Sequence, residues 1–583
     1  MNKPSHPTMA PDRPVITVVI AMVVLLGLVY LATRPSGPMA PVDSETTSNE
    51  SEDADAPAIP ATGEPDQLTV VDPAEIVDLD EAELAYDGDL DVAVSFPVLP
   101  NAEPLTDFLD RTLSASVEAF DAANPGAESY EAEWQLTAAN DDVVGVRMTS
   151  LETDSEGTRE CHTTYWYDTA TGQAFESTHL FGGQEQLAEV NAMVREGVPD
   201  AADSDTIHPV GALYDSVGFN PDGDLVVEFD AGQVSAPGEG RVHAVLDREV
   251  TEPLLSELGA RVRDAATVGV RAFTIAGPPE ADKDGQDAPA PGHLSPVDDE
   301  VDCSDPETKC VALTYDDGPG GGTPALLDTL AEYDARATFF VTGVPVMEDP
   351  LTVRRTYAEG HEIANHTLGH PDLTGLSESG VRSELATVQA QIYRETGYTP
   401  DLMRPPYGAT DDKVASVTAD MGLAQILWSI DTNDWKDRDA SVVKGRALSG
   451  ASDGAIILLH DIHDTSITAS HDIIRELDSR GYTMVTVSQL LGTTEPGETY
   501  VDGVPAPPEE SPSPDEGDDG GGDGDGNGND DHPDSRSHGE HGDHERRQGH
   551  GGHGSHGSDG GHESHPGRGG HEGNEGNEGN EDE

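Results

Sequence analysis

Short apolar runs alternate with stretches of helical spacing from residue 301 to residue 491 of the 583-residue chain. The strand-like runs are VALTY, ATFFV, HEIAN, DLMRP, AQILWSI, AIILLH and TMVTV. The helix-like stretches between them include TPALLDTLAEYD, ESGVRSELATVQAQIYRETG and ITASHDIIRELDSRG. Repeated strand–helix units indicate a parallel sheet covered by helices. We therefore predict an α/β domain over 301–491, a compact and distorted (β/α) barrel that need not close completely.

The stretch from residue 73 to residue 278 has a different pattern. LDVAVSFPVL and DVVGVRMTSL alternate apolar and polar residues as half-buried strands do, and YWYDTATGQAF has the form of a hairpin. LTDFLDRTLSASVEAF has helical spacing. This mixture predicts a separate α+β domain ahead of the barrel.

An uncharged run of 18 residues, Val15 to Ala32, lies near the start of the chain. It is long enough to cross a bilayer and longer than the usual apolar core of a signal peptide. Lys3 and Arg13 precede it, so we expect residues 1–14 to stay in the cytoplasm. The run predicts an uncleaved, single-pass signal anchor at the cell membrane, with everything after it extracytoplasmic. A cleaved signal peptide is the alternative.

Three further segments have few apolar residues, and we expect none of them to fold. The tail also contains HGGHGSHG, which allows two interpretations: weak metal capture, or a plain hydrophilic tail. The segments are a spacer (33–72), a linker (279–300) and an acidic Gly- and His-rich tail (492–583).

The chain is strongly acidic, with 113 Asp and Glu against 31 Lys and Arg, a formal net charge of −82. This charge argues against nucleic acid and anionic membrane surfaces as partners. An ordinary acidic secreted protein is one interpretation. We favour a salt-adapted, halophilic surface, because salt screens such self-repulsion.

The three cysteines suit an oxidising compartment. Cys303 and Cys310 lie seven residues apart ahead of the first barrel strand, and we expect a short-loop disulfide between them. Cys161 is left over, and we expect a buried thiol.

Two adjacent carboxylates, Asp316 and Asp317, directly follow the strand VALTY. The carboxyl ends of parallel strands are where such barrels place their chemistry. After the strand HEIAN, His366 and His370 are four residues apart, a spacing that one helical turn brings to the same face. Two imidazoles and one carboxylate form the usual ligand set of a catalytic metal with an open position.

Three more short segments follow later strands: RPPYG, DTNDW and LLHDIH. Together with TYDDGP and HTLGH they match, in order and spacing, the five motifs of the NodB-like polysaccharide deacetylases, carbohydrate esterase family four. The resemblance covers about a third of the chain, from Cys303 to Leu491. Tyr315 stands where phenylalanine is commoner in the family, and Leu368-Gly369 replaces a more usual aromatic–small pair.

The resemblance implies an N-deacetylase and a role for each motif residue. Asp317, His366 and His370 would hold a divalent metal, with Zn²⁺ expected and Co²⁺, Ni²⁺ and Mn²⁺ as alternatives. Asp316 would be the base that takes a proton from water. Arg404 would keep Asp316 charged and aimed.

The remaining motifs imply the acid and the substrate contacts. His460 would protonate the leaving amine, and Asp434 would keep its imidazole charged. The backbone N–H of Tyr407 would stabilise the oxyanion. The residues expected to contact substrate are Pro405, Tyr407, Trp435 and Leu458.

Residues 73–278 more loosely resemble the extracytoplasmic domain of lysozyme-sensing anti-sigma factors, through SFPVLP, YWYDTATGQAF, GFNPDGDLVVEFD and LLSELG. Some membrane-anchored peptidoglycan deacetylases pair similar domains, which favours a cell-wall polysaccharide as substrate. The sugar, GlcNAc or MurNAc, and the oligomeric state stay open. Two other functions also stay open: deacetylation of another polysaccharide, such as an exopolysaccharide or a chitin-like polymer, and a non-enzymatic wall-binding or lysozyme-sensing role.

Overall fold

The computed structural model describes residues 62–268 and 301–503, apart from residues 125, 156, 237, 239 and 306. The predicted anchor, the linker and nearly all of the tail lie outside these residues. Within the described ranges, no helix is both long enough and apolar enough to cross a membrane.

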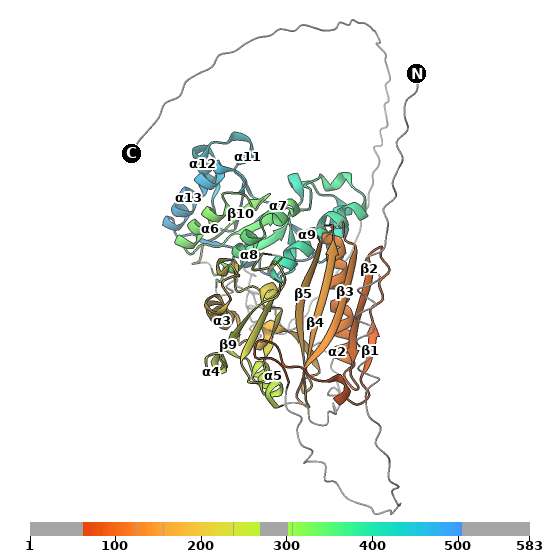
Figure 1. Cartoon of the computed structure of the whole chain (residues 1–583). Helices are drawn as coiled ribbons and strands as arrows, with labels where there is room; N and C mark the ends of the chain where they lie inside the picture. Colours follow the sequence, from red (N-terminus) through yellow and green to blue (C-terminus); the bar gives the residue numbers. More distant parts are fainter. Residues whose placement is uncertain are drawn as a thin grey trace, which may run out of the picture. The chain divides into compact units, whose positions relative to one another are not determined.

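A six-stranded sheet builds the first part of the N-terminal domain (Figure 1). Its strands follow chain order and pair antiparallel, except that β2 and β3 are parallel. Helix α2 (Glu103–Ala123) connects these two strands, and its apolar residues at helical spacing form a core with the sheet. The strands are β1 (Asp80–Glu83), β2 (Asp91–Val98), β3 (Ser129–Ala139), β4 (Val143–Asp154), β5 (Gly157–Asp168) and β6 (Gln173–Glu176).

A three-stranded antiparallel sheet and three helices form the second part of this domain. The predicted α+β mixture is therefore observed. These elements are α3 (Gln184–Gly197), β7 (Ser216–Phe219), β8 (Leu225–Phe229), β9 (Val242–Leu246), α4 (Arg248–Thr251) and α5 (Glu257–Val268).

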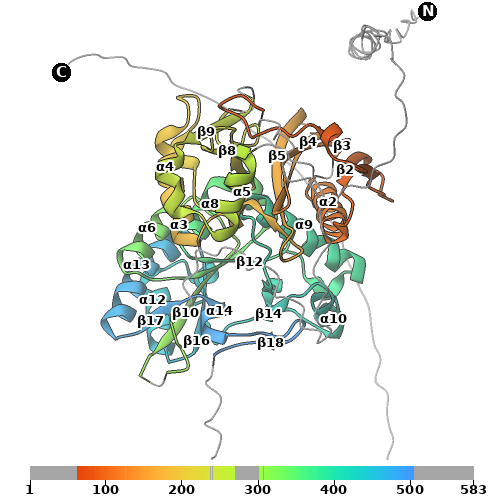
Figure 2. The same cartoon turned by 90° about the horizontal axis from the view of Figure 1, so that it is seen from below.

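All strand pairs in the nine-stranded sheet of the C-terminal domain are parallel, as the alternating pattern predicts. The order is β15-β16-β10-β11-β12-β13-β14-β18, with β17 also paired to β10. Figure 2 shows β10, β16 and β17 lying together in this sheet. β15 and β18 stand at opposite ends of this order, so the barrel is incomplete. The strands are β10 (Cys310–Asp316), β11 (Thr338–Val341), β12 (Glu362–Asn365), β13 (Leu402–Met403), β14 (Ala424–Ile426), β15 (Ile430–Asp431), β16 (Ala455–His460), β17 (Thr483–Val485) and β18 (Thr499–Tyr500).

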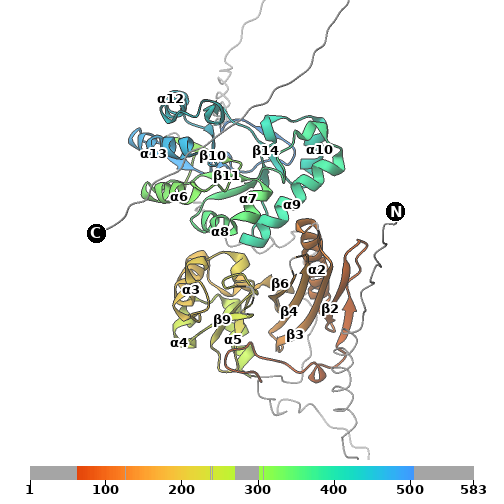
Figure 3. The same cartoon turned by 45° about the horizontal axis from the view of Figure 1, so that its top comes forward.

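Helices surround this sheet on its outer side (Figure 3). The three helices predicted from apolar spacing are α6, α9 and α13, and each is present. The full set is α6 (Thr323–Glu332), α7 (Gly343–Glu348), α8 (Pro350–Ala358), α9 (Glu378–Thr396), α10 (Asp412–Asp420), α11 (Asp434–Asp437), α12 (Ala440–Gly450), α13 (Asp464–Ser479) and α14 (Val487–Leu491).

The pleat of β10 decides which side chains face the site. Val311, Leu313 and Tyr315 belong to the core shared with the helices. Because side chains alternate along a strand, Thr314 and Asp316 lie on the opposite, inner face.

Two boundaries differ from the prediction. The predicted spacer ends too late, because Leu68 and Val71 are buried and Val71 bridges to Leu136. The predicted tail begins too early, since β18 pairs with β14. A two-residue Thr–Tyr strand has no apolar run by which the sequence could reveal it.

The cysteines are arranged largely as expected. Cys303 and Cys310 form a disulfide, which ties the chain ahead of β10 to the start of that strand. Cys161 is free, but it is half-buried rather than buried.

Candidate active site

The ends of four parallel strands of this sheet bring the motif residues together. β10 ends at Asp316, and its register places this residue beside His460 at the end of β16. β12 ends one residue before His366, and β13 ends one residue before Arg404. A parallel sheet thus converts motifs that are far apart in sequence into one cluster at its carboxyl edge.

The backbone beside the candidate metal ligands is unusual at four non-glycine residues. Asp317, Thr367, His370 and Tyr407 have φ of 72°, 70°, 56° and 62°. Residues other than glycine adopt this left-handed region at a cost of roughly 1–3 kcal/mol each, and such residues cluster at functional sites. The sharp turn after β10 therefore separates Asp317 from the strand that holds Asp316.

The helical turn expected at His366–His370 is absent, which corrects the prediction. The segment is a loop, and the positive φ of Thr367 and His370 breaks the helical path. The N–H of His370 donates to Oγ1 of Thr367, 3.0 Å away. The two imidazoles nevertheless converge, with ring centroids 4.9 Å apart.

Asp317, His366 and His370 form a compact set of potential metal ligands. One ligand atom from each residue lies within 4.8 Å of the others. Oδ1 of Asp317 is 3.6 Å from Nε2 of His366 and 3.4 Å from Nε2 of His370. One carboxylate and two imidazoles at this spacing suit a divalent ion with open positions.

The protonation state of His366 is also suited to binding a metal cation. Nδ1–H of His366 donates to the carbonyl oxygen of Arg404, 2.7 Å away, which leaves Nε2 with a free lone pair toward the other ligands. Burial lowers the pKa of His366 to about 3, so its imidazole is neutral. Oδ1 of Asp317 is buried and accepts no hydrogen bond from the described residues. These residues fit a bound metal ion.

Asp316 has a different environment from its neighbour. Its Oδ1 accepts a hydrogen bond from Nη1 of Arg404 at 2.6 Å, and both side chains are buried. Its Oδ2 lies 3.7 Å from Nε2 of His366. One oxygen is therefore held by Arg404, and the other faces the metal-ligand set.

The guanidinium of Arg404 is held by several further contacts. Its other donors bond to Oγ1 of Thr314 at 2.8 Å and to the carbonyl oxygens of Ile426 and Leu427 at 3.0 Å each. Its guanidinium lies over the ring of Phe340, 4.0 Å from the centroid. This network holds the arginine in one orientation.

The pKa of Asp316 reflects two opposed effects. Burial raises it, and the charge and hydrogen bond of Arg404 lower it by a smaller amount, so the net direction is upward. A carboxylate whose pKa is raised toward working pH is a better general base than an ordinary aspartate.

His460 and Asp434 form a second buried pair. Nδ1–H of His460 donates to Oδ1 of Asp434 at 2.8 Å, and the backbone N–H of His460 donates to Oδ2 at 2.8 Å. Burial opposes charge on His460, but the hydrogen bond to Asp434 and the nearby carboxylates, Asp316 among them, outweigh it and raise its pKa to about 9. The imidazole is therefore a cation at neutral pH and can donate a proton.

The residues predicted to contact substrate lie around this pair and the histidines. Tyr407 is 70% exposed, and its ring packs edge-on against His370, 4.7 Å between centroids. Trp435 is 51% exposed, whereas Leu458 and Pro405 are buried. Leu458 precedes His460 by two residues on β16 and so shares its face of the sheet.

Comparison with known proteins matches residues 304–426 to the family model described as polysaccharide deacetylase. A peptidoglycan-N-acetylglucosamine deacetylase of Bacillus cereus is 34% identical over 190 residues, which are 32% of this chain and 69% of that protein. This chain belongs to the polysaccharide deacetylase family.

Two relatives longer than the Bacillus cereus protein are more similar in sequence to this chain. The peptidoglycan-N-acetylglucosamine deacetylase PgdA of Listeria monocytogenes is 43% identical over 196 residues. The peptidoglycan-N-acetylmuramic acid deacetylase PdaC of Bacillus subtilis is 43% identical over 187 residues. The matched stretches are 33% and 32% of this chain, but only 41% and 39% of those two proteins.

Two residues of the candidate site were missed by the sequence analysis. Thr314 accepts a hydrogen bond from Arg404, and Ser466 donates one to Oδ2 of Asp434 at 2.5 Å. Thr314 lies two residues before Asp316, so strand alternation could have revealed it. Ser466 lies on α13 outside every motif, and no pattern in the sequence marks it.

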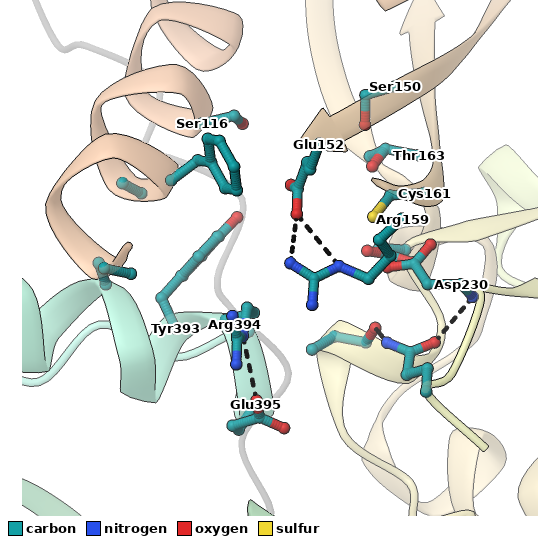
Figure 4. Close-up of a pocket in the computed structure, with 18 of the residues that line it drawn as sticks. Ser116, Ser150, Glu152, Arg159, Cys161, Thr163, Asp230, Tyr393, Arg394 and Glu395 are labelled. Atoms are coloured by element: carbon teal, nitrogen blue, oxygen red, sulfur yellow. Dashed lines mark hydrogen bonds and ion pairs between the residues drawn. The ribbon is translucent and has the colours of Figure 1, made fainter. Parts of the chain in front are cut away.

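The protein also has a cavity of about 460 Å³ between α2, β5 and α9 (Figure 4). Its wall contains three ion pairs, Glu152–Arg159, Arg394–Glu395 and Arg354–Glu395, and the free thiol of Cys161. None of the residues that line this cavity belongs to the metal-ligand set or to the Asp316 and His460 pairs. The cavity is therefore distinct from the candidate active site.

The separate environments of the two aspartates generate the first prediction. Asp317→Asn and His366→Ala remove a ligand, so we expect Zn²⁺ affinity to fall by about 100-fold or more. Asp316→Asn leaves all three ligands, so we expect affinity within about ten-fold of the parent protein and a loss of most deacetylase activity. Isothermal titration with Zn²⁺ and an acetate-release assay measure the two effects.

A matched control is His471→Ala, because His471 is an exposed histidine on α13 outside the ligand set. This variant should match the parent protein in both assays. Equal metal affinity of the Asp316→Asn and Asp317→Asn variants would contradict the division of labour between the two carboxylates.

The raised pKa of His460 generates a pH prediction. The acid is protonated below about pH 9, so kcat/KM should fall as pH rises through that value. Asp434→Asn removes the charge and should move this fall to lower pH by roughly one unit or more. Because the folded pKa lies above the ordinary value, the pair stabilises the fold fully below about pH 6.5, and this stabilisation is lost as pH rises toward 9.

Asp437→Asn is the control, since this carboxylate lies on the same short helix but pairs with Arg446. In the Asp437→Asn variant, kcat/KM should fall at the same alkaline pH as in the parent protein. An alkaline limb that is unchanged in the Asp434→Asn variant would show that His460 is not the acid that titrates there.

Proposed function

We propose that this protein removes N-acetyl groups from amino sugars of peptidoglycan and releases acetate. One observation carries the proposal. Asp317, His366 and His370 form a ligand set for a divalent ion beside the buried carboxylate of Asp316. The strand register places the charged imidazole of His460 next to Asp316. Amide hydrolysis needs these three functions: an electrophile for the carbonyl, a base for water and an acid for the amine.

Zn²⁺ is the ion we propose, because a tetrahedral site with two imidazoles and one carboxylate is typical of catalytic zinc. When bound, such an ion polarises the acetamide carbonyl and lowers the pKa of water. Oδ2 of Asp316 then accepts the proton of the attacking water, while Arg404 holds Oδ1. The raised pKa of Asp316 makes this transfer more favourable.

The acid acts on the other side of the scissile bond. His460 donates a proton to the nitrogen as the C–N bond breaks, and Asp434 holds its imidazole by Nδ1–H. The backbone N–H of Tyr407 stabilises the oxyanion, and the left-handed backbone at that residue sets its direction. Pro405, Leu458 and Trp435 bound the acetyl group and the sugar.

Peptidoglycan is the substrate that the relatives support. The Bacillus cereus and Listeria proteins are named for N-acetylglucosamine, and the Bacillus subtilis protein is named for N-acetylmuramic acid. For this chain we propose deacetylation of either sugar. The exposed Tyr407 and Trp435 provide faces on which a sugar ring can pack.

We also propose that the enzyme works outside the cytoplasm and is held by the anchor at residues 15–32. The disulfide between Cys303 and Cys310 supports an oxidising compartment. The resemblance of residues 73–278 to extracytoplasmic sensing domains supports the same location.

Mass spectrometry of muropeptides tests this function. Purified full-length protein with Zn²⁺ should convert muropeptides to species that have lost one acetyl group, and fragmentation assigns the loss to GlcNAc or MurNAc. The Asp316→Asn protein should leave the same preparation unchanged, because the base is absent.

A parallel reaction with N-acetylated chitin oligomers separates peptidoglycan specificity from general deacetylation. Unchanged muropeptides together with deacetylated chitin oligomers would reject the proposed substrate. The absence of acetate release from either polymer by the metal-loaded protein would reject the enzyme.

A further inference from the structure

Ser466 contacts the acid pair from a helix that contributes no other residue to the proposed chemistry. It lies in the first turn of α13, and its Oγ–H donates to Oδ2 of Asp434 at 2.5 Å. Ser466 and Asp434 are both fully buried. Hydrogen bonds to charged groups are about twice as strong as those between neutral groups, so this contact is energetically significant.

The carboxylate of Asp434 accepts four hydrogen bonds, two at each oxygen. Oδ1 accepts from Nδ1–H of His460 and from the backbone N–H of Trp435, each at 2.8 Å. Oδ2 accepts from the backbone N–H of His460 at 2.8 Å and from Ser466. Three of these four donors belong to His460 and Trp435, and Ser466 supplies the fourth from a separate helix.

This arrangement fixes the rotation of the carboxylate. Both oxygens must stay in place for Oδ1 to face the imidazole of His460, and Ser466 is the only hydroxyl among the four donors. Without that hydroxyl, Oδ2 keeps one hydrogen bond and loses a buried partner. The carboxylate is then held less firmly at Oδ2, and so is the imidazole that it orients.

The backbone of Ser466 takes part in two further hydrogen bonds, neither of which involves its hydroxyl. Its N–H donates to the carbonyl oxygen of His463 at 2.9 Å. Its carbonyl oxygen accepts from Oγ–H of Ser470 at 2.8 Å, and Ser470 accepts from Oη–H of Tyr315 at 3.1 Å. The start of α13 is therefore tied to β10, the strand that also carries Asp316.

We propose that Ser466 is a positioning residue for the catalytic acid: it locks the carboxylate of Asp434 so that His460 faces the leaving amine. The inference rests on the proposed deacetylase function. Its competitor is a purely structural role, in which Ser466 only helps α13 to pack.

The comparison of Ser466→Ala with Ser470→Ala separates these roles. Both serines are fully buried on α13, and both changes delete one hydroxyl. Only Ser466 touches Asp434, whereas Ser470 bonds to Tyr315 and to the helix backbone. For Ser466→Ala we expect kcat to fall about ten-fold with KM within about two-fold, and for Ser470→Ala we expect both within about two-fold.

The same two changes in an Asp434→Asn background complete the test. In this background Ser466→Ala should lower kcat by less than about two-fold, because the carboxylate that Ser466 positions is already absent. Equal losses of kcat in the two serine variants would overturn the inference. So would a fall in kcat of about ten-fold when Ser466→Ala is added to the Asp434→Asn variant.

Proton NMR gives a readout that needs no turnover. The Nδ1–H signal of His460 in the full-length, ¹⁵N-histidine-labelled protein, assigned with a His460→Gln variant, should persist in Ser470→Ala and shift or disappear in Ser466→Ala. An identical signal in all three proteins would reject the positioning role. If the parent protein releases no acetate, the proposed function fails, and this NMR comparison still decides what Ser466 does.

Discussion

The buried ion pair between Arg404 and Asp316 is the interaction on which the rest of the site depends. Burial of two charges is costly, and it is tolerated only where hydrogen bonds satisfy both groups. Arg404 meets this condition through Thr314, Asp316 and the carbonyl oxygens of Ile426 and Leu427. It therefore ties β10 to the chain around β14. Removal of either charge would leave the other unpaired, at a cost of about 3–5 kcal/mol.

This constraint explains how two adjacent aspartates serve two purposes. The last residue of β10, Asp316, points into the barrel and is held by Arg404. The next residue, Asp317, leaves the strand with a φ of 72° and turns its carboxylate toward His366 and His370. One strand end thus supplies a base and a metal ligand that do not compete for the same partner. The acid pair of His460 and Asp434 completes the site from β16 and α11.

Much of this arrangement could be predicted from the sequence, because its causes are local. Strands that are buried have apolar runs, as in β10, β11, β12 and β16. Helices that bury one face have apolar residues at helical spacing, as in α6, α9 and α13. The geometry of HTLGH could not be predicted in the same way. Its i, i+4 spacing suggested a helical turn, whereas the positive φ of Thr367 and His370 makes a loop. Ser466 was missed for a related reason, since its partner Asp434 is brought close only by the tertiary packing of α13.

The most direct test of the account is the position of the metal in a crystal grown with Zn²⁺, located by anomalous diffraction at the zinc edge. We expect one strong peak about 2.0–2.2 Å from Oδ1 of Asp317 and from Nε2 of His366 and His370. Asp316 should remain bonded to Arg404 and should not touch the ion. A peak ligated by Asp316, or a peak away from these three residues, would contradict the division between the two carboxylates.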